Sequence, residues 1–136
     1  MVEDRITDGK RIAQLLASEL DGREDGELDA VAVSNADRDV EPTADGARAY
    51  DVVLTRRDES DGRHRFARTF VHDDRARLEF EAGQEHAAAA ADEAGLRVRP
   101  KATQPPRTLV FVESGAAVKR ATDVVQTVVR RLRDEE

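Results

Sequence analysis

Two alternating segments on either side of Asp73-Asp74 constrain the fold of this chain more than any other feature. Arg63–His72 and Arg75–Glu81 alternate apolar residues with charged or polar ones, a pattern typical of β-strands. With Asp73-Asp74 as a two-residue turn, the register of an antiparallel hairpin is fixed, and one of its faces is mainly apolar. That face consists of the pairs Val71 with Ala76, Thr69 with Leu78 and Ala67 with Phe80.

The opposite face of this predicted hairpin carries charges and two aromatic rings. Its side chains are His64, Phe66, Arg68, Phe70 and His72 on the first strand and Arg77, Glu79 and Glu81 on the second. Phe66 and Phe70 together would form an apolar patch, which needs a cover. A helix of the same chain is the favoured cover. A second copy of the chain is the alternative, with Phe66 and Phe70 as the interface of a homodimer.

Periodic segments elsewhere predict three helices and further strands. Apolar residues from Ile6 to Leu20 recur at helical spacing, with Asp8 as the cap of the main turns and Gly22 as the end of the helix. The second helix is Gln84–Ala94. The third runs from its N-cap Ser114 to about Arg133. The last helix has an apolar stripe that we expect to face the sheet: Val118, Ala121, Val125, Val128 and Leu132. The further strands are Leu28–Ser34, Ala49–Thr55, Leu96–Arg99 and Thr108–Val112. The order α-β-β-β-β-α-β-β-α predicts an α+β fold, a mainly antiparallel sheet of about five to six strands with three helices.

The length of 136 residues predicts one globular domain that spans residues 1–136. We expect residues 35–46 and 100–106 to be exposed loops and residues 134–136 to be a frayed tail. The N-terminus shows no basic start followed by an apolar run, and no stretch approaches 18 apolar residues. A cytoplasmic protein without a membrane segment is therefore expected.

The kind of charge in this chain points to a salt-rich environment. Charged residues make up 38% of the sequence, with 29 Asp and Glu, and the only lysines are Lys10, Lys101 and Lys119. In molar salt the Debye length shrinks to about 3 Å, so dense like charges scarcely repel, whereas in dilute buffer they strain the fold. An extreme halophile is the favoured source, and a GC-rich bacterium is the alternative.

Three stretches resemble a family of short, uncharacterised haloarchaeal proteins. They are Gly46–Leu54 (GARAYDVVL), Leu96–Val125 and the opening Met1–Leu20, which together cover less than half of the chain. The resemblance implies a haloarchaeal origin. Because the family has no assigned activity, the resemblance implies no catalytic residues.

The residue types that catalysis or metal binding needs are sparse. The chain has no cysteine, which removes disulfides, thiol chemistry and cysteine-bound zinc. Ser114 has no histidine near it in the sequence to act as its base, and a helix cap explains it better. His64 and His72 would lie about 26 Å apart on one strand, too far to share an ion. We therefore expect no catalytic residue, no metal site and no cofactor, and we lean against an enzyme.

The strongest functional signal is a segregation of charge along the chain. Residues 97–133 hold nine basic side chains against Glu113 and Asp123, although the whole chain carries a net charge of −7. A basic segment and a helix N-terminus both attract anions. The candidate anion-binding residues are Arg97, Arg99, Lys101, Arg107, Ser114, Gly115, Lys119 and Arg120. The alternative is that the basic residues pair with acids of adjacent strands within the chain.

A non-enzymatic small binding or protein-interaction module is the favoured function. The alternative is an anion-binding protein that takes a phosphate metabolite or a nucleic acid on the basic segment 97–133. Nucleic acid is disfavoured, because no exposed aromatic residues for base stacking lie near this segment. Molar salt would also weaken contacts that depend on counterion release.

Overall fold

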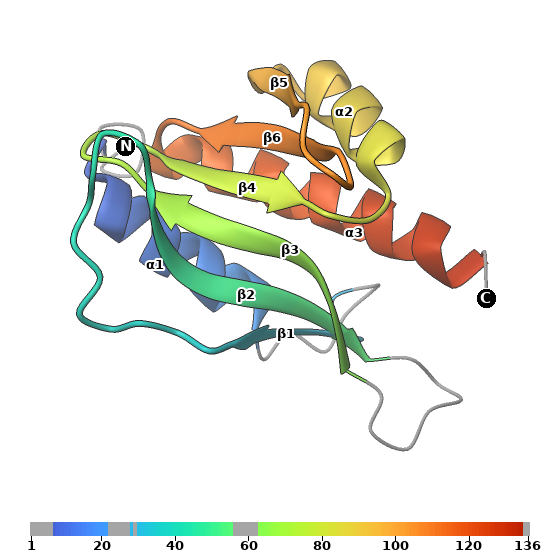
Figure 1. Ribbon diagram of the computed structural model, residues 1–136, viewed down its shortest axis with the longest axis horizontal. Coiled ribbons are helices and arrows are strands. Elements are labelled where there is room, and N and C mark those ends of the chain that lie inside the picture. Colours follow the sequence, from blue (N-terminus) through green and yellow to red (C-terminus); the bar gives the residue numbers. More distant parts are fainter. Residues whose placement is uncertain (1–6, 22–27, 29, 56–62, 135–136) are drawn as a thin grey trace.

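The computed structural model describes residues 7–21, 28, 30–55 and 63–134 (Figure 1). Along the chain these residues form α1 (Gly9–Leu20), β1 (Val31–Ser34), β2 (Ala47–Thr55), β3 (Arg63–Val71), β4 (Ala76–Phe80), α2 (Gln84–Glu93), β5 (Val98–Lys101), β6 (Arg107–Val112), a 3-10 turn η3 (Gly115–Ala117) and α3 (Val118–Asp134). The predicted α+β fold and its order α-β-β-β-β-α-β-β-α are confirmed. The predicted helix end at Gly22 lies outside the described residues.

All six strands join one antiparallel sheet in the order β1-β2-β3-β4-β6-β5. The helix α2 links β4 to the edge strand β5, and β6 lies between these two strands. The helices cover one face of the sheet, with α1 and α3 behind it in the view of Figure 1. A single core joins this face to the helices through buried side chains such as Leu16 of α1, Leu78 of β4 and Val125 of α3.

The hairpin register predicted from the sequence is confirmed in every pair. Val71 lies opposite Ala76, Thr69 opposite Leu78 and Ala67 opposite Phe80. The first residue of α1 contacts the turn at Asp73-Asp74, where the Gly9 amide donates to the Asp73 carbonyl at 3.0 Å. A Cβ atom on Gly9 would lie 1.8 Å from the His72 carbonyl oxygen, so only glycine permits this approach. Asp8 caps α1 as predicted, and its carboxylate accepts from the Arg11 amide at 3.0 Å.

The final helix packs on the core as predicted. Its whole predicted stripe is buried: Val118, Ala121, Val125, Val128 and Leu132. Ser114 caps the 3-10 turn η3 that leads into α3, since its hydroxyl accepts from the Ala117 amide at 3.2 Å. The basic C-terminal third is therefore a docked element and not a free arm. Within the described part of the chain, no helix has the length and apolar composition needed to cross a membrane.

The prediction that Phe66 faces away from the core is wrong. Phe66 is 2% exposed and packs against Phe80, with ring centroids 6.4 Å apart. The cause is a bulge in β3, where Val52 pairs with Ala67 but Val53 pairs with Arg65, so Phe66 is the extra residue. A bulge turns one side chain to the other face, which strict alternation cannot reveal. Phe66 is thus core and unavailable as an interface residue.

Several predicted boundaries need correction. The loop expected at residues 100–106 is shorter, because β5 continues through Pro100 to Lys101. The missing amide of proline is tolerated there because β5 is an edge strand. The first strand begins at Val31 and not at Leu28, which is buried in a 3-10 turn. Residues 35–46 form the predicted loop, in which Val40 is buried. Asp134, which was expected to belong to a frayed tail, is the last residue of α3.

Candidate functional site

The face of the sheet opposite the helices, which we call the open face, gathers basic side chains from five strands. The pairing registers and the contacts described below place the following on it: Arg48, Arg65, Arg68, Arg75, Arg77, Arg97, Arg99, Lys101 and Arg107. The carboxylates on the same face are Asp51, Glu79, Glu81 and Glu113. Among the described residues, nine cations thus meet these four carboxylates, with Asp74 as a fifth that pairs with Arg75 at 2.8 Å, although the net charge of the whole chain is −7. The fold concentrates positive charge on the open face.

Glu79 lies at the centre of this face and is fully buried. Arg77 donates to its carboxylate from Nε at 2.9 Å and from Nη2 at 2.5 Å, and Arg107 donates from Nη1 at 3.0 Å. The Lys101 ammonium adds a third cation at 3.7 Å. Burial alone would raise the pKa of Glu79, but the hydrogen bonds from Arg77 and Arg107 and the nearby charges outweigh it and lower the pKa. Glu79 is therefore an ionised anchor that fixes three cations.

Ion pairs extend this network across the sheet. Glu81 accepts from Arg65 Nε at 2.8 Å and lies 3.3 Å from Arg107 Nη2. The Arg68 Nε atom lies 3.8 Å from both Glu81 and Asp51, so it joins β4 to β2. Asp51 in turn accepts from the Asn35 amide at 3.0 Å. The charged side chains of the open face thus form a continuous layer from the loop after β1 to β5.

Arginine side chains also cover the two aromatic rings of the open face. The Arg77 guanidinium stacks over Phe70 at 4.5 Å from the ring centroid. Arg75 and Arg97 lie over Phe111 at 5.6 Å and 4.9 Å, and Phe111 is only 5% exposed. Stacking of this kind is favourable and also shields the rings from water. Phe111 is consequently closed to an incoming base or apolar side chain, whereas Phe70 stays partly exposed beside Arg77.

A corner formed by the end of the 35–46 loop holds Arg77 in place. Arg77 Nη1 donates to the Asp45 carbonyl and to His72 Nε2, both at 2.8 Å. His72 Nδ1 donates to the Ala44 carbonyl at 3.0 Å, which fixes the neutral tautomer. Burial lowers the pKa of His72 against the opposing effect of the Ala44 bond. Glycine suits position 46 because its φ of +93° is one that other residues rarely adopt, and a Cβ atom there would also lie 2.3 Å from Arg77 Nη1.

The structure brings together half of the residues predicted to bind an anion. Arg97, Arg99, Lys101 and Arg107 lie on the open face; Lys101 and Arg107 pair with Glu79, and Arg97 pairs with Glu113 at 3.2 Å. Arg99 is exposed and has no ion pair with another described residue. The other four lie elsewhere: Ser114 and Gly115 at η3, and Lys119 and Arg120 on α3, where Arg120 donates to the Ala94 carbonyl at 3.1 Å. The eight residues do not form one site.

Sequence reasoning missed the contribution of β2, β3 and β4 to this face. Arg48, Arg65, Arg68, Arg75 and Arg77 all belong to the acidic two thirds of the chain. The predicted hairpin already placed Arg68 and Arg77 on the outer side. The missing step was to pair β4 with β6, which joins this hairpin to the basic segment.

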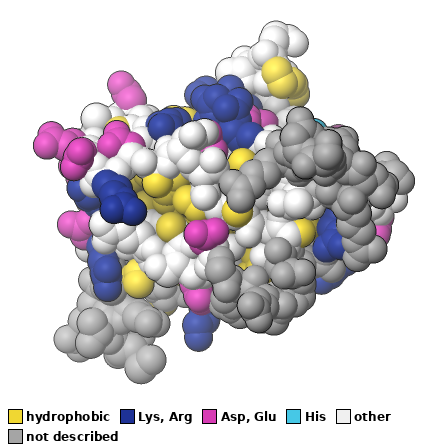
Figure 2. Space-filling view, turned by 90° about the horizontal axis from the view of Figure 1, so that it is seen from below, with side chains coloured by type: hydrophobic (Ala, Val, Ile, Leu, Met, Phe, Trp, Pro, Cys, Tyr) yellow, Lys and Arg dark blue, Asp and Glu magenta, His cyan; other side chains and the backbone are white. Residues whose placement is uncertain are grey.

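Away from the open face, a hollow of about 290 Å³ lies between α1, β1 and the 35–46 loop. Figure 2 views the molecule from below, where β1 and this loop lie in Figure 1, and shows hydrophobic side chains gathered near the middle of that side. Tyr50 forms part of the wall, and its hydroxyl donates to the Ala13 carbonyl at 2.7 Å. Burial raises the pKa of Tyr50, so the hydroxyl stays protonated and ties β2 to α1.

A family model matches the whole chain, residues 1–136. The chain belongs to DUF7993, a family of unknown function. The resemblance to an uncharacterised family is thereby confirmed, and this membership brings no assigned activity to the open face. No curated protein and no solved structure matches the chain. Among the described residues, no group of three or more His, Asp or Glu side chains is arranged to hold a metal ion.

We predict that Glu79→Gln destabilises the protein by about 2–4 kcal/mol, because it leaves Arg77 and Arg107 without their buried counter-charge. Urea unfolding at neutral pH measures this loss. The matched control is Glu113→Gln, whose carboxylate is half exposed and should change stability by less than about 0.5 kcal/mol.

The loss of stability caused by Glu79→Gln should depend on pH. The folded pKa of Glu79 lies below the ordinary value of 4.5, so its contribution is complete above that pH and is lost as the pH falls through the folded pKa. The difference between wild type and Glu79→Gln should therefore shrink in acid. Equal stability of the two at neutral pH would show that Glu79 does not anchor the face.

Proposed function

We propose that the protein is a non-enzymatic interaction module that binds an acidic protein segment across the open face. The observation that carries this proposal is the excess of cations on a sheet face that no described helix covers. Opposite charge on two surfaces gives specificity and speeds association more than it adds affinity. The groups offered are guanidinium, ammonium and carboxylate groups held in ion pairs, which suits binding better than catalysis.

The width of the open face favours a macromolecule over a small anion. Its cations come from β2, β3, β4, β6 and β5, which at the usual strand spacing span about 19 Å. A phosphate metabolite would contact only a part of such an area. An extended acidic segment can meet Arg99 and Lys101 at one edge and Arg48 or Arg65 toward the other.

Two features favour a protein partner over a nucleic acid. Phe111 is buried under two arginines, and Phe70 is only partly exposed beneath Arg77, so the face offers no extended platform for stacked bases. Asp51 and Glu81 are interleaved with the cations and would repel a uniform row of phosphates. A protein segment that carries both signs of charge can match this mixture.

We predict that an acidic peptide of about 20 residues, rich in Glu with a few interspersed Lys and labelled with a fluorophore, binds the protein. Arg99→Glu combined with Lys101→Glu should weaken binding at least tenfold, because it reverses the two cations at the β5 edge of the face. The control is Arg11→Glu with Lys119→Glu, which changes net charge equally at exposed positions on α1 and α3 and should leave binding within about twofold. Fluorescence anisotropy at several salt concentrations measures both.

Unlabelled competitors of the peptide in the same assay distinguish a protein partner from a small phosphate compound or a nucleic acid. Inorganic tripolyphosphate and random-sequence duplex DNA should displace the peptide only weakly. Displacement by either one at concentrations below that of an unlabelled peptide would contradict a protein partner. An equal loss of binding in both double variants would show that net charge, and not the open face, drives the binding.

We also infer that the protein is haloarchaeal and adapted to molar salt, since 29 acidic residues accompany only Lys10, Lys101 and Lys119. Salt screens the repulsion among exposed carboxylates, whereas buried pairs such as Arg77–Glu79 are screened much less. We predict a higher midpoint of thermal unfolding by circular dichroism in molar KCl than in dilute buffer. An equal or lower midpoint in KCl would contradict the adaptation.

A further inference from the structure

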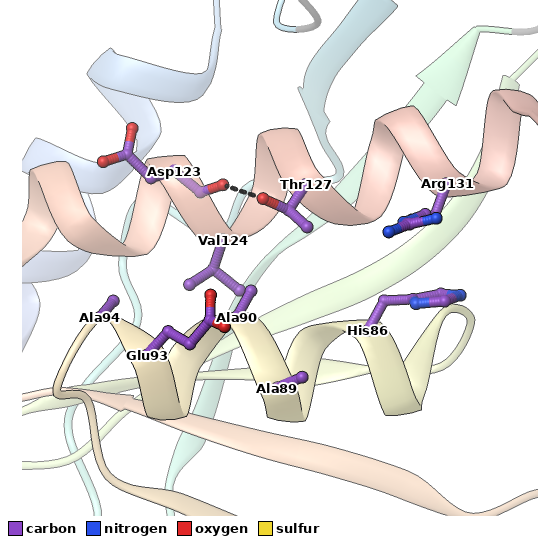
Figure 3. A pocket seen from close by; sticks show the side chains of 9 residues that line it. All are labelled: His86, Ala89, Ala90, Glu93, Ala94, Asp123, Val124, Thr127 and Arg131. Atoms are coloured by element: carbon purple, nitrogen blue, oxygen red, sulfur yellow. Dashed lines mark hydrogen bonds between the residues drawn. The ribbon is translucent and has the colours of Figure 1, made fainter.

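A groove between α2 and α3 has charged ends and a nearly apolar middle (Figure 3). It encloses about 410 Å³ on the helical side of the molecule, away from the open face. Ala89, which is exposed, and Ala90 lie at the middle on α2, and Thr127 lies at the middle on α3. The Thr127 hydroxyl is already satisfied, because it donates to the Asp123 carbonyl at 3.1 Å.

The ionisable side chains of the two helices lie in matching order along the groove. Figure 3 shows His86 and Arg131 beside each other at one end of the groove, whereas Glu93 and Asp123 lie toward the other end. His86 and Glu93 are two helical turns apart, about 10 Å, and Asp123 and Arg131 are about 12 Å apart along α3. The groove therefore has one basic and one acidic end, and each end contains a group from each helix.

This pattern is complementary to a second copy of itself. A two-fold axis that crosses the groove at its middle brings Arg131 and His86 of one copy onto Asp123 and Glu93 of the other, and the reverse contact follows by symmetry. A two-fold axis that runs along the groove would instead bring like charges together. We propose that two copies of the chain dock through this groove, with α2 antiparallel to α2 and α3 antiparallel to α3 of the second copy.

The middle of the groove fits this arrangement. The axis passes beside Ala89, Ala90 and Thr127, and such small side chains allow helix axes to approach within the usual 8–10 Å. Three nearby charges oppose the pattern. Glu85 precedes His86, and Asp134 follows Arg131 by about one helical turn. Arg120 lies near the acidic end but donates to the Ala94 carbonyl. Asp123 and Arg131, both exposed on α3, carry most of the complementarity.

Docking through the groove differs from the homodimer anticipated through Phe66 and Phe70. Phe66 is buried in the core, and Phe70 lies under Arg77 on the open face. A dimer formed through α2 and α3 leaves both open faces accessible. The inference stands independently of the proposed function, since no residue of the groove belongs to the open face.

The absence of cysteine permits a direct test with single introduced thiols. Ala89→Cys should form a disulfide-linked dimer under mild oxidation in molar KCl, because Ala89 lies beside the axis. The control Ala36→Cys, exposed in the 35–46 loop, should stay uncrosslinked. Equal crosslinking of the two variants would overturn the proposal. Preferred crosslinking of Ala89→Cys with Thr127→Cys in a mixture would overturn the orientation.

Light scattering of the unmodified protein should give twice the mass of one chain. Arg131→Glu and Asp123→Arg should each weaken the dimer at least tenfold, because each places like charges together across the axis. The double variant Arg131→Glu with Asp123→Arg should recover the dimer. A single-chain mass for the wild type, or a double variant no better than the single ones, would overturn the proposal, and circular dichroism checks that each variant folds.

Discussion

The buried carboxylate of Glu79 is the interaction on which the rest of the open face depends. A fully buried charge is tolerated only when it is paired and hydrogen-bonded. Arg77 and Arg107 supply those bonds, and Lys101 adds a third charge. Because Glu79 and Glu81 together pair with five cations, the pairing that stabilises β4 and β6 leaves positive charge on this face. Stability and surface charge thus have one origin in this face.

The apolar side chains on the two faces of the sheet are shielded from water in different ways. Helices bury one face with small and branched apolar residues, in keeping with a chain that has few aromatic rings. On the other face, arginine side chains stack on Phe70 and Phe111 and close the surface without a helix. Because long arginine stems cover apolar area while their charged ends stay wet, this face remains available to a partner.

The sequence predicted the fold better than the site. Alternation and a two-residue turn were enough to give the pairs Val71 with Ala76 and Ala67 with Phe80, because local periodicity determines the register. The bulge at Phe66 and the strand through Pro100 depend on neighbouring strands and were not visible locally. The open face required the pairing of β4 with β6, two strands separated by α2 and β5 in the chain. Arg77 and Arg107 are far apart in sequence, and only that pairing shows that they share Glu79.

The most direct test of this account is the pKa of Glu79, measured by the pH titration of its side-chain carboxyl carbon in NMR spectra. If Arg77 and Arg107 hold the carboxylate as described, Glu79 titrates below the ordinary value of 4.5. That depression should persist in molar KCl, because salt screens a buried pair only weakly. A pKa at or above 4.5 would mean that burial outweighs the pairing, and it would contradict the description of Glu79 as the anchor of the open face.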